Sequence, residues 1–230
     1  MNNHGTSNNG NTNPRHGSAA GGQAPLRTHI LCIVDRSGSM QPIATDAMGG
    51  YNTFLESQRR LPGEAVMTLV LFDHEYQRVC TAAPLAEAPM LDAGNYVPRG
   101  TTALLDAIGR GIEEVRAAGA RDGAPGERVI VAILTDGYEN ASTDYTQAMV
   151  AGRIDELQLK HDWEFVYLGA NQDAIAVAAQ MNISPERSAS FAATPAGVQQ
   201  AYHRMNDFVA FSRAAPPSDD DAKNRKKRGK

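Results

Sequence analysis

The sequence predicts a doubly wound α/β fold, in which helices cover both faces of a mostly parallel central sheet that has one antiparallel edge strand. Apolar runs of strand length alternate along the chain with segments of helical periodicity. This order is expected when parallel strands are joined by right-handed helical crossovers. One pair of strand-like segments is separated by only a short polar gap, which permits a hairpin and so indicates an antiparallel strand there.

The expected parallel strands are continuous apolar runs without polar alternation. Strands that are buried on both faces of a sheet show this pattern. The segment Tyr76–Cys80 closely follows Asp73, His74 and Glu75 and is expected to be the antiparallel edge strand. The parallel runs are Ile30–Val34, Val66–Phe72 apart from Thr68, Val129–Leu134 and Phe165–Leu168.

The expected helices carry apolar residues at helical spacing, so that each has one buried face. A first helix over about Pro42–Arg60 is less regular, because Gly49 and Gly50 lie inside it, and a short helix is expected over Asp173–Met181. The regular faces are formed by Leu104, Ile108, Ile112 and Val115, by Val150, Ile154 and Leu157, and by Val198, Ala201, Met205, Phe208 and Ser212.

The folded domain is expected to span residues 27–213. The chain has 230 residues, of which 42% are apolar and 21% charged, ordinary usage for one α/β domain with tails. Residues 1–26 are rich in Asn, Gly and Ser, and residues 214–230 combine prolines with an acidic and then a basic run. Both segments offer little to bury and are expected to be disordered.

A cytoplasmic location is expected. No apolar run approaches the roughly 20 residues that a membrane span needs, and the first residues contain no apolar core of a secretory signal. The two cysteines, Cys32 and Cys80, form no disulfide framework, which suits a reducing compartment. The net charge of −4 is too small to indicate a partner by itself.

Oxygen-bearing side chains follow the first expected strand. Asp35, Ser37 and Ser39 offer one carboxylate and two hydroxyls within five residues, and Gly38 permits a tight turn. Hard cations prefer oxygen ligands, and Mg²⁺ takes six of them at about 2.0–2.1 Å. The alternative is an ordinary helix N-cap, a position that Asp and Ser also favour.

A second acid is expected at the same edge of the sheet. Asp136 follows the Val129–Leu134 run in the way that Asp35 follows the first run. Parallel strands bring their carboxyl ends to one edge, where sheets of this kind bind ligands. Tyr138 and Glu139, just beyond Asp136, are expected either to line the rim of this site or to form an ordinary exposed loop.

A threonine pair opens the helix that begins near Leu104. A hydroxyl of Thr101 or Thr102 could supply a further ligand. The other interpretation is a helix cap, with Asp106 as a first-turn acid that the helix dipole stabilises. The residues alone leave both interpretations open.

Together these motifs resemble the von Willebrand factor A-type domain family, in its intracellular bacterial branch. The metal-ion-dependent adhesion site of that family combines Asp-x-Ser-x-Ser with a separated Thr and a separated Asp. The family's threonine loop is similar to Gly-x-Thr-x-Leu-x-Asp-Ala, which matches residues 100–107 and selects Thr102 over Thr101. The resemblance covers about residues 28–212 and includes Phe72-Asp73. The five site positions are all present, as Asp35, Ser37, Ser39, Thr102 and Asp136.

The resemblance implies a Rossmann-like fold and a cation-dependent protein-binding module that acts as an adaptor or assembly factor and not as an enzyme. Ser37, Ser39 and Thr102 would ligate Mg²⁺ directly, or Mn²⁺, which accepts the same oxygen octahedron. Asp35 and Asp136 would act through waters or hydrogen bonds. Neutral hydroxyls leave most of the ionic charge uncompensated, so an open position attracts an Asp or Glu carboxylate of a partner protein. No membrane partner is expected.

Two other functions are weighed against protein binding. A phosphatase-like hydrolase could use Asp35 with Mg²⁺, but Ser37 stands where an Asp-x-Asp pair needs its second acid, and no Gly-x-Ser-x-Gly or phosphate-loop motif is present. The basic run at residues 223–230 could bind nucleic acid non-specifically. No interleaved aromatic residues support base stacking, so binding to nucleic acid is disfavoured.

Overall fold

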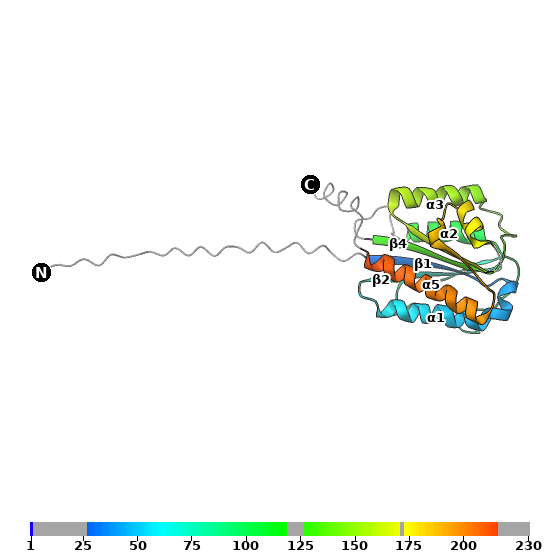
Figure 1. Cartoon of the computed structure of the whole chain (residues 1–230), viewed down its shortest axis with the longest axis horizontal. Coiled ribbons are helices and arrows are strands. Elements are labelled where there is room, and N and C mark those ends of the chain that lie inside the picture. Colours follow the sequence, from blue (N-terminus) through cyan, green and yellow to red (C-terminus); the bar gives the residue numbers. More distant parts are fainter. Residues whose placement is uncertain (2–26, 119–126, 171–172, 216–230) are drawn as a thin grey trace.

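The computed structural model describes residues 1, 27–118, 127–170 and 173–215, and these form an α/β fold around a six-stranded sheet (Figure 1). The strand order is β3-β2-β1-β4-β5-β6, and every neighbouring pair is parallel except β2 with β3. The predicted sheet with one antiparallel edge strand is therefore confirmed. The strands are β1 (Arg27–Asp35), β2 (Ala65–Phe72), β3 (Tyr76–Pro84), β4 (Glu127–Thr135), β5 (Glu164–Ala170) and β6 (Ser188–Phe191).

Helices cover both faces of the sheet, as predicted. Side chains of α1 and α5 pack on one face, and those of α2, α3 and α4 pack on the other (Figure 1). The helices are α1 (Ala44–Arg60), α2 (Leu104–Ala117), α3 (Gln147–His161), α4 (Ala174–Gln180) and α5 (Pro195–Ala214), with 3-10 turns η1 (Gly38–Ile43) and η2 (Pro185–Arg187).

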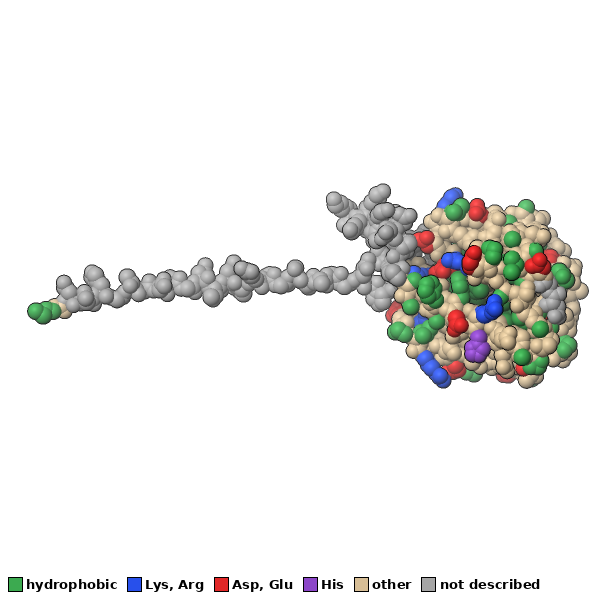
Figure 2. All heavy atoms as spheres, viewed as in Figure 1, with side chains coloured by type: hydrophobic (Ala, Val, Ile, Leu, Met, Phe, Trp, Pro, Cys, Tyr) green, Lys and Arg blue, Asp and Glu red, His purple; other side chains and the backbone are tan. Residues whose placement is uncertain are grey.

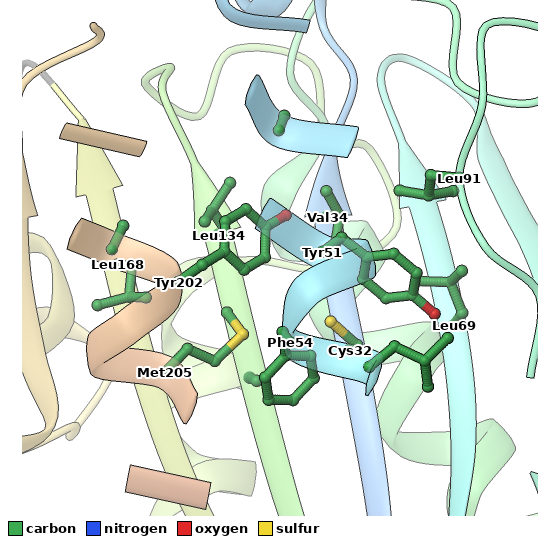
Figure 3. Close-up of a cluster of buried hydrophobic side chains, with 14 of the residues drawn as sticks. Cys32, Val34, Tyr51, Phe54, Leu69, Leu91, Leu134, Leu168, Tyr202 and Met205 are labelled. Atoms are coloured by element: carbon green, nitrogen blue, oxygen red, sulfur yellow. The ribbon is translucent and has the colours of Figure 1, made fainter. Parts of the chain in front are cut away.

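The central strand β1 is apolar from Ile30 to Val34 because each of its faces meets a layer of helices. Cys32 and Val34 lie in the cluster of buried side chains under α1 and α5, which also includes Phe54 and Met205 (Figure 3). The intervening Ile33 lies in the cluster on the opposite face. Each fully buried aliphatic side chain of this kind contributes about 1.5–3 kcal/mol of hydrophobic stabilisation.

One glycine of the pair inside the first helix has a packing role. A Cβ atom on Gly50 would lie 2.1 Å from the ring of Tyr202 on α5. Gly50 therefore lets the aromatic ring pack directly against the backbone of α1, and this close contact offsets the cost of about 1 kcal/mol that glycine carries inside a helix. Gly49, in contrast, faces open space.

Some elements differ from the predicted ones, among them the edge strand β3, which was predicted to end at Cys80 and runs to Pro84. The short strand β6 (Ser188–Phe191) was not predicted, because its sequence Ser-Ala-Ser-Phe is not an apolar run. The first helix begins as the 3-10 turn η1, which contains Pro42, and becomes α-helical only at Ala44. Helix α5 ends at Ala214, and the tails predicted to be disordered lie, apart from residues 1, 214 and 215, outside the described residues.

The strand order changes direction between β1 and β4. The chain leaves β1 toward α1 on one face of the sheet and leaves β4 toward α3 on the other. The connections therefore separate at this point and leave a crevice at the carboxyl edge, where ligands bind in sheets of this type. Among the described residues, the helices are too short or too polar to cross a membrane.

Candidate metal centre

The two predicted acids lie at the carboxyl edge of neighbouring strands. Asp35 is the last residue of β1, and Asp136 follows the last residue of β4. Asp35 is fully buried, whereas Asp136 retains 9% of its surface exposed. The sheet therefore brings together two carboxyl groups that lie about a hundred residues apart in the sequence, at the point where the strand order changes direction.

The buried carboxylate of Asp35 organises the loop that follows it. Oδ1 accepts a 2.6 Å hydrogen bond from the backbone N–H of Ser37, and Oδ2 accepts one of 2.6 Å from the hydroxyl of Thr135. Burial raises the pKa of Asp35 to about 6, although these hydrogen bonds oppose the shift. Both oxygens of Asp35 thus hold the backbone and side chain of its neighbours, and a cation bound in the site would favour the ionised form of this acid.

The two predicted serines and Asp136 form one hydrogen-bonded chain. The hydroxyl oxygens of Ser37 and Ser39 are 3.0 Å apart, and Ser39 donates a 2.6 Å hydrogen bond to Oδ1 of Asp136. Burial raises the pKa of Asp136 as well. Ser37 occupies the N-cap position of η1, but its side chain makes no capping hydrogen bond there. The helix-cap alternative therefore does not account for this serine.

Thr102 faces the same space from a different connection. Thr102 is 3% exposed. Its backbone N–H donates to the side-chain oxygen of Asn140, and the backbone N–H of Asn140 donates to the carbonyl of Thr102. A Cβ atom on Gly137 would lie 2.9 Å from Thr102 Oγ1 and 3.5 Å from Ser39 Oγ. Both hydroxyls thus surround the space that the missing side chain leaves free.

The cap interpretation is confirmed for Asp106, which is the acid of the first turn of α2, but neither threonine is the cap. The N-cap residue of α2 is Ala103, and no side chain caps the helix from that position. The first turn is bound instead by Glu139, whose carboxylate accepts from the N–H groups of Leu105, Ala141 and Ser142. Glu139 is therefore a structural residue of the loop, while Tyr138 beside it is 62% exposed.

The donor set fits a small hard cation. Two ligands at right angles, each about 2.1 Å from one ion, stand about 3.0 Å apart, and this is the separation of the Ser37 and Ser39 oxygens. Within the residues that the structure describes, no group of three or more His, Cys, Asp or Glu side chains is suited to a metal. A cation here would therefore be held mainly by neutral hydroxyl oxygens.

Several residues that support the site were not predicted. The hydroxyl of Tyr96 donates a 2.6 Å hydrogen bond to the backbone carbonyl of Asp35. The carboxylate of Asp73 binds Arg36 and Arg99. Asp73 had a signal in the sequence, since it follows the apolar run of β2 as Asp35 follows that of β1. Tyr96 could not be located from the sequence, because only the tertiary fold brings its side chain to β1.

Comparison with known proteins identifies the fold. No protein-family model and no curated protein sequence matches the chain. Three solved structures illustrate the likeness. They are proximal thread matrix protein 1 from the mussel byssus with a zinc-occupied MIDAS motif (TM-score 0.58, 13% identity, 81% of this chain and 46% of that chain), von Willebrand factor type A from Catenulispora acidiphila (0.53, 17%, 80% and 42%) and the pilus adhesin SpaC from Lactobacillus rhamnosus GG (0.58, 16%, 82% and 30%).

The chain has the fold of von Willebrand factor A-type domains. It spans less than half the length of each of the three proteins, at identities of 13–17%. At that distance the likeness shows a shared fold and not a shared function.

Proposed function

We propose that this chain is a protein-binding module that holds one divalent cation, Mg²⁺ or Mn²⁺, and uses it to bind a carboxylate of another protein. Ser37, Ser39 and Thr102 would ligate the ion directly. Asp35 and Asp136 would hold these ligands by hydrogen bonds or bind the ion through water. The proposal is carried by one observation, the convergence of hydroxyls from two separate loops beside two buried acids at the switch point of the sheet.

The side chains of the site prepare the oxygens for a cation. Because Ser39 gives its only proton to Asp136, Ser37 is the donor in its hydrogen bond with Ser39, and one lone pair of the Ser39 oxygen remains available to an ion. The same hydrogen bond to a carboxylate makes that oxygen a better donor, as outer carboxylates do at metal sites. Asp35 holds the backbone N–H of Ser37, which fixes the turn that brings the two serines together.

A cation held in this way keeps much of its charge. Hydroxyl ligands are neutral, and the two acids are placed to contact the hydroxyls and the loop. The ion therefore attracts an anionic ligand at any open position, and a carboxylate forms a strong charge-assisted contact there. An Asp or Glu side chain of a partner supplies this group, and the cation supplies the attraction that holds it.

The solved structures with this fold support the proposal. The mussel byssus protein has zinc in its MIDAS motif, and the Lactobacillus protein is a pilus adhesin. For this chain Mg²⁺ or Mn²⁺ suits the hydroxyl donors better than Zn²⁺ does, because Zn²⁺ favours nitrogen and sulfur ligands. The cytoplasmic location and the bacterial adaptor role stay predictions.

Two observations favour binding over the alternatives. Asp35 is fully buried, and both of its oxygens accept hydrogen bonds, which leaves it poorly placed to act as a nucleophile. On the face shown in Figure 2, basic and acidic side chains of the described residues are interspersed, so no basic patch for nucleic acid is formed there. The basic run at residues 223–230 lies outside the described residues.

A capture experiment tests the proposal. The immobilised chain is incubated with native lysate in Mg²⁺ or in excess chelator, and we expect a specific partner to be retained only with Mg²⁺. Thr102→Ala should abolish this retention, whereas Thr101→Ala is the matched control, since Thr101 is exposed. Retention of the same partner in excess chelator would contradict the proposal, and loss in the Thr101 variant would place the ligand one residue earlier.

Calorimetry with Mg²⁺ alone gives an independent measurement. Removal of the Thr102 hydroxyl should weaken Mg²⁺ binding by about tenfold or more, equivalent to about 1.4 kcal/mol. Equal Mg²⁺ affinity in the parent chain and the Thr102 variant would show that this threonine is not a ligand of the ion.

A further inference from the structure

A third acid at a strand end, Asp73, lies beside the candidate metal centre without belonging to the set of proposed ligands. It follows β2, and its side chain is fully buried. Oδ2 accepts a 2.9 Å hydrogen bond from Nε of Arg36 and a 3.0 Å hydrogen bond from Nε of Arg99. Oδ1 accepts from the N–H of Glu75 at 2.6 Å. One carboxylate thus binds two guanidinium groups and its own turn.

The two arginines belong to the two loops that carry the proposed ligands. Arg36 lies between Asp35 and Ser37 in the first loop. Arg99 lies just before the threonine pair, and its backbone N–H donates a 2.9 Å hydrogen bond to the carbonyl of Arg36. The carboxylate of Asp73 therefore joins the serine loop to the threonine loop through charged side chains, in addition to this backbone contact.

The threonine loop is bound to the same residue on both sides of Thr102. Before Thr102, the side chain of Arg99 contacts the carboxylate of Asp73. After Thr102, the N–H of Ala103 donates a 2.8 Å hydrogen bond to the backbone carbonyl of Asp73. Between them, the carbonyl of Gly100 accepts a 3.1 Å hydrogen bond from Gly38. Asp73 thus contacts the chain on both sides of Thr102, while Asn140 binds Thr102 itself.

We propose that Asp73 is a positioning residue of the metal centre, which holds Thr102 at the distance from Ser37 and Ser39 that a shared cation requires. This inference rests on the proposed function, because it concerns the same ion. Its physical basis is the buried ion pair. Arg36 is only 6% exposed, so a neutral side chain at position 73 leaves a nearly buried cation without its counter-charge. Arg36 then shifts toward solvent, Arg99 keeps only its ion pair with Glu75, and the threonine loop loses its charged link to the serine loop.

A double-mutant cycle tests this role with Mg²⁺ alone as the probe. Calorimetry on the full chain compares the parent, Asp73→Asn, Thr102→Ala and the double variant. Asp73→Asn should weaken Mg²⁺ binding by about tenfold or more, since residues that orient metal ligands are typically worth about 10–100-fold. In the Thr102→Ala background the same change should cause little further loss, because the two residues then act through one ligand.

Two further variants separate positioning from general damage. Asp92→Asn is the matched control, because Asp92 also binds backbone N–H groups, those of Gly94 and Asn95, in the connection before α2. It should bind Mg²⁺ as the parent does. If Asp73→Asn fails to fold, Arg99→Gln replaces it, because Arg99 is half-exposed and its loss leaves Asp73 paired with Arg36. A smaller loss of affinity in the same direction is expected.

The outcomes distinguish this inference from the function on which it rests. A parent chain that binds no Mg²⁺ overturns both. A parent that binds Mg²⁺, with unchanged affinity in a folded Asp73→Asn or Arg99→Gln variant, overturns only the role of Asp73. Losses that add fully in the double variant overturn it too, because Asp73 would then act independently of Thr102.

Discussion

The hydroxyl of Thr135, the last residue of β4, donates a 2.6 Å hydrogen bond to Oδ2 of Asp35, the last residue of β1. This contact joins the two central strands at the edge of the sheet that carries the proposed metal centre. Among the described residues, Asp35 has neutral hydrogen-bond donors and no ion pair with a basic side chain. A buried carboxylate in this environment is compensated by dipoles alone, and its charge therefore destabilises the metal-free fold.

Asp35→Asn should stabilise the metal-free chain at pH 7. Burial raises the pKa of Asp35 from 3.8 to about 6, so the folded state disfavours the charged form, at a cost of about 3 kcal/mol once the pH exceeds both values. Asparagine can still accept from Ser37 N–H and donate to Thr135. Chemical unfolding in chelator measures the gain.

The same variant should lose the stabilisation that Mg²⁺ gives to the parent, because ligand binding to the folded state raises stability. The sign of the change thus reverses between chelator and Mg²⁺. A variant that is less stable than the parent under both conditions would show that Asp35 has a structural role only.

Gly137→Ala should weaken Mg²⁺ binding while the chain stays folded. The added methyl would lie 2.9 Å from Thr102 Oγ1, so this hydroxyl must move away from the space that it shares with Ser39. Calorimetry with Mg²⁺ measures the effect, for which we expect a loss of about tenfold or more, or about 1.4 kcal/mol.

Gly152→Ala provides the control for this glycine substitution. A Cβ atom at Gly152, in the middle of α3, meets nothing within 4 Å. This change should leave Mg²⁺ binding unaltered and raise stability by up to about 1 kcal/mol, since alanine is the better helix former. Unchanged Mg²⁺ affinity in the Gly137 variant would show that Thr102 does not ligate the cation.

His29, at the far end of β1 from the metal centre, should make stability depend on pH. Burial lowers its pKa from 6.5 to about 4, and its ring contacts the hydroxyl of Thr68 at 2.8 Å. The ring is therefore neutral when folded, and its 3.9 Å approach to Glu127 is a contact rather than an ion pair. The unfolded chain takes up a proton first as the pH falls.

The contribution of His29 is complete above about pH 6.5 and is lost as the pH falls toward 4. Between pH 7.5 and 5 we expect this residue to account for a loss of about 2 kcal/mol in the free energy of unfolding. Urea unfolding of the parent and of His29→Gln measures it, because the variant should lack this part of the pH dependence. If the free energy of unfolding changed equally with pH in the parent and in the variant, His29 would not be a neutral, buried imidazole.

The sequence allowed the sheet to be predicted where burial leaves a clear pattern. The runs in β1, β2, β4 and β5 are apolar because both faces of these strands are covered, and such runs are visible without a structure. Strand β6 has four residues, two of them serines, and it forms because β5 offers a free edge. That pairing is a tertiary effect and leaves no local signal.

The residues of the candidate site likewise include some that could be located from the sequence and some that could not. Asp35 and Asp136 could be located because each ends an apolar run. The resemblance to a family selected Thr102, and the structure places its hydroxyl beside the Ser39 hydroxyl, around Gly137. The role of Asp73 could not be derived, because it depends on two arginines that reach it from other loops.

The pairing of Val34 with Leu134 has a consequence for how such a domain can diversify. Backbone hydrogen bonds of the sheet set the spacing of the two acids, so loop length has little influence on it. Thr102, in contrast, lies in the long connection between β3 and α2. Insertions or grafted sequences in that connection can alter what surrounds the ion while the acids stay fixed, which makes it the natural place to engineer a new partner preference.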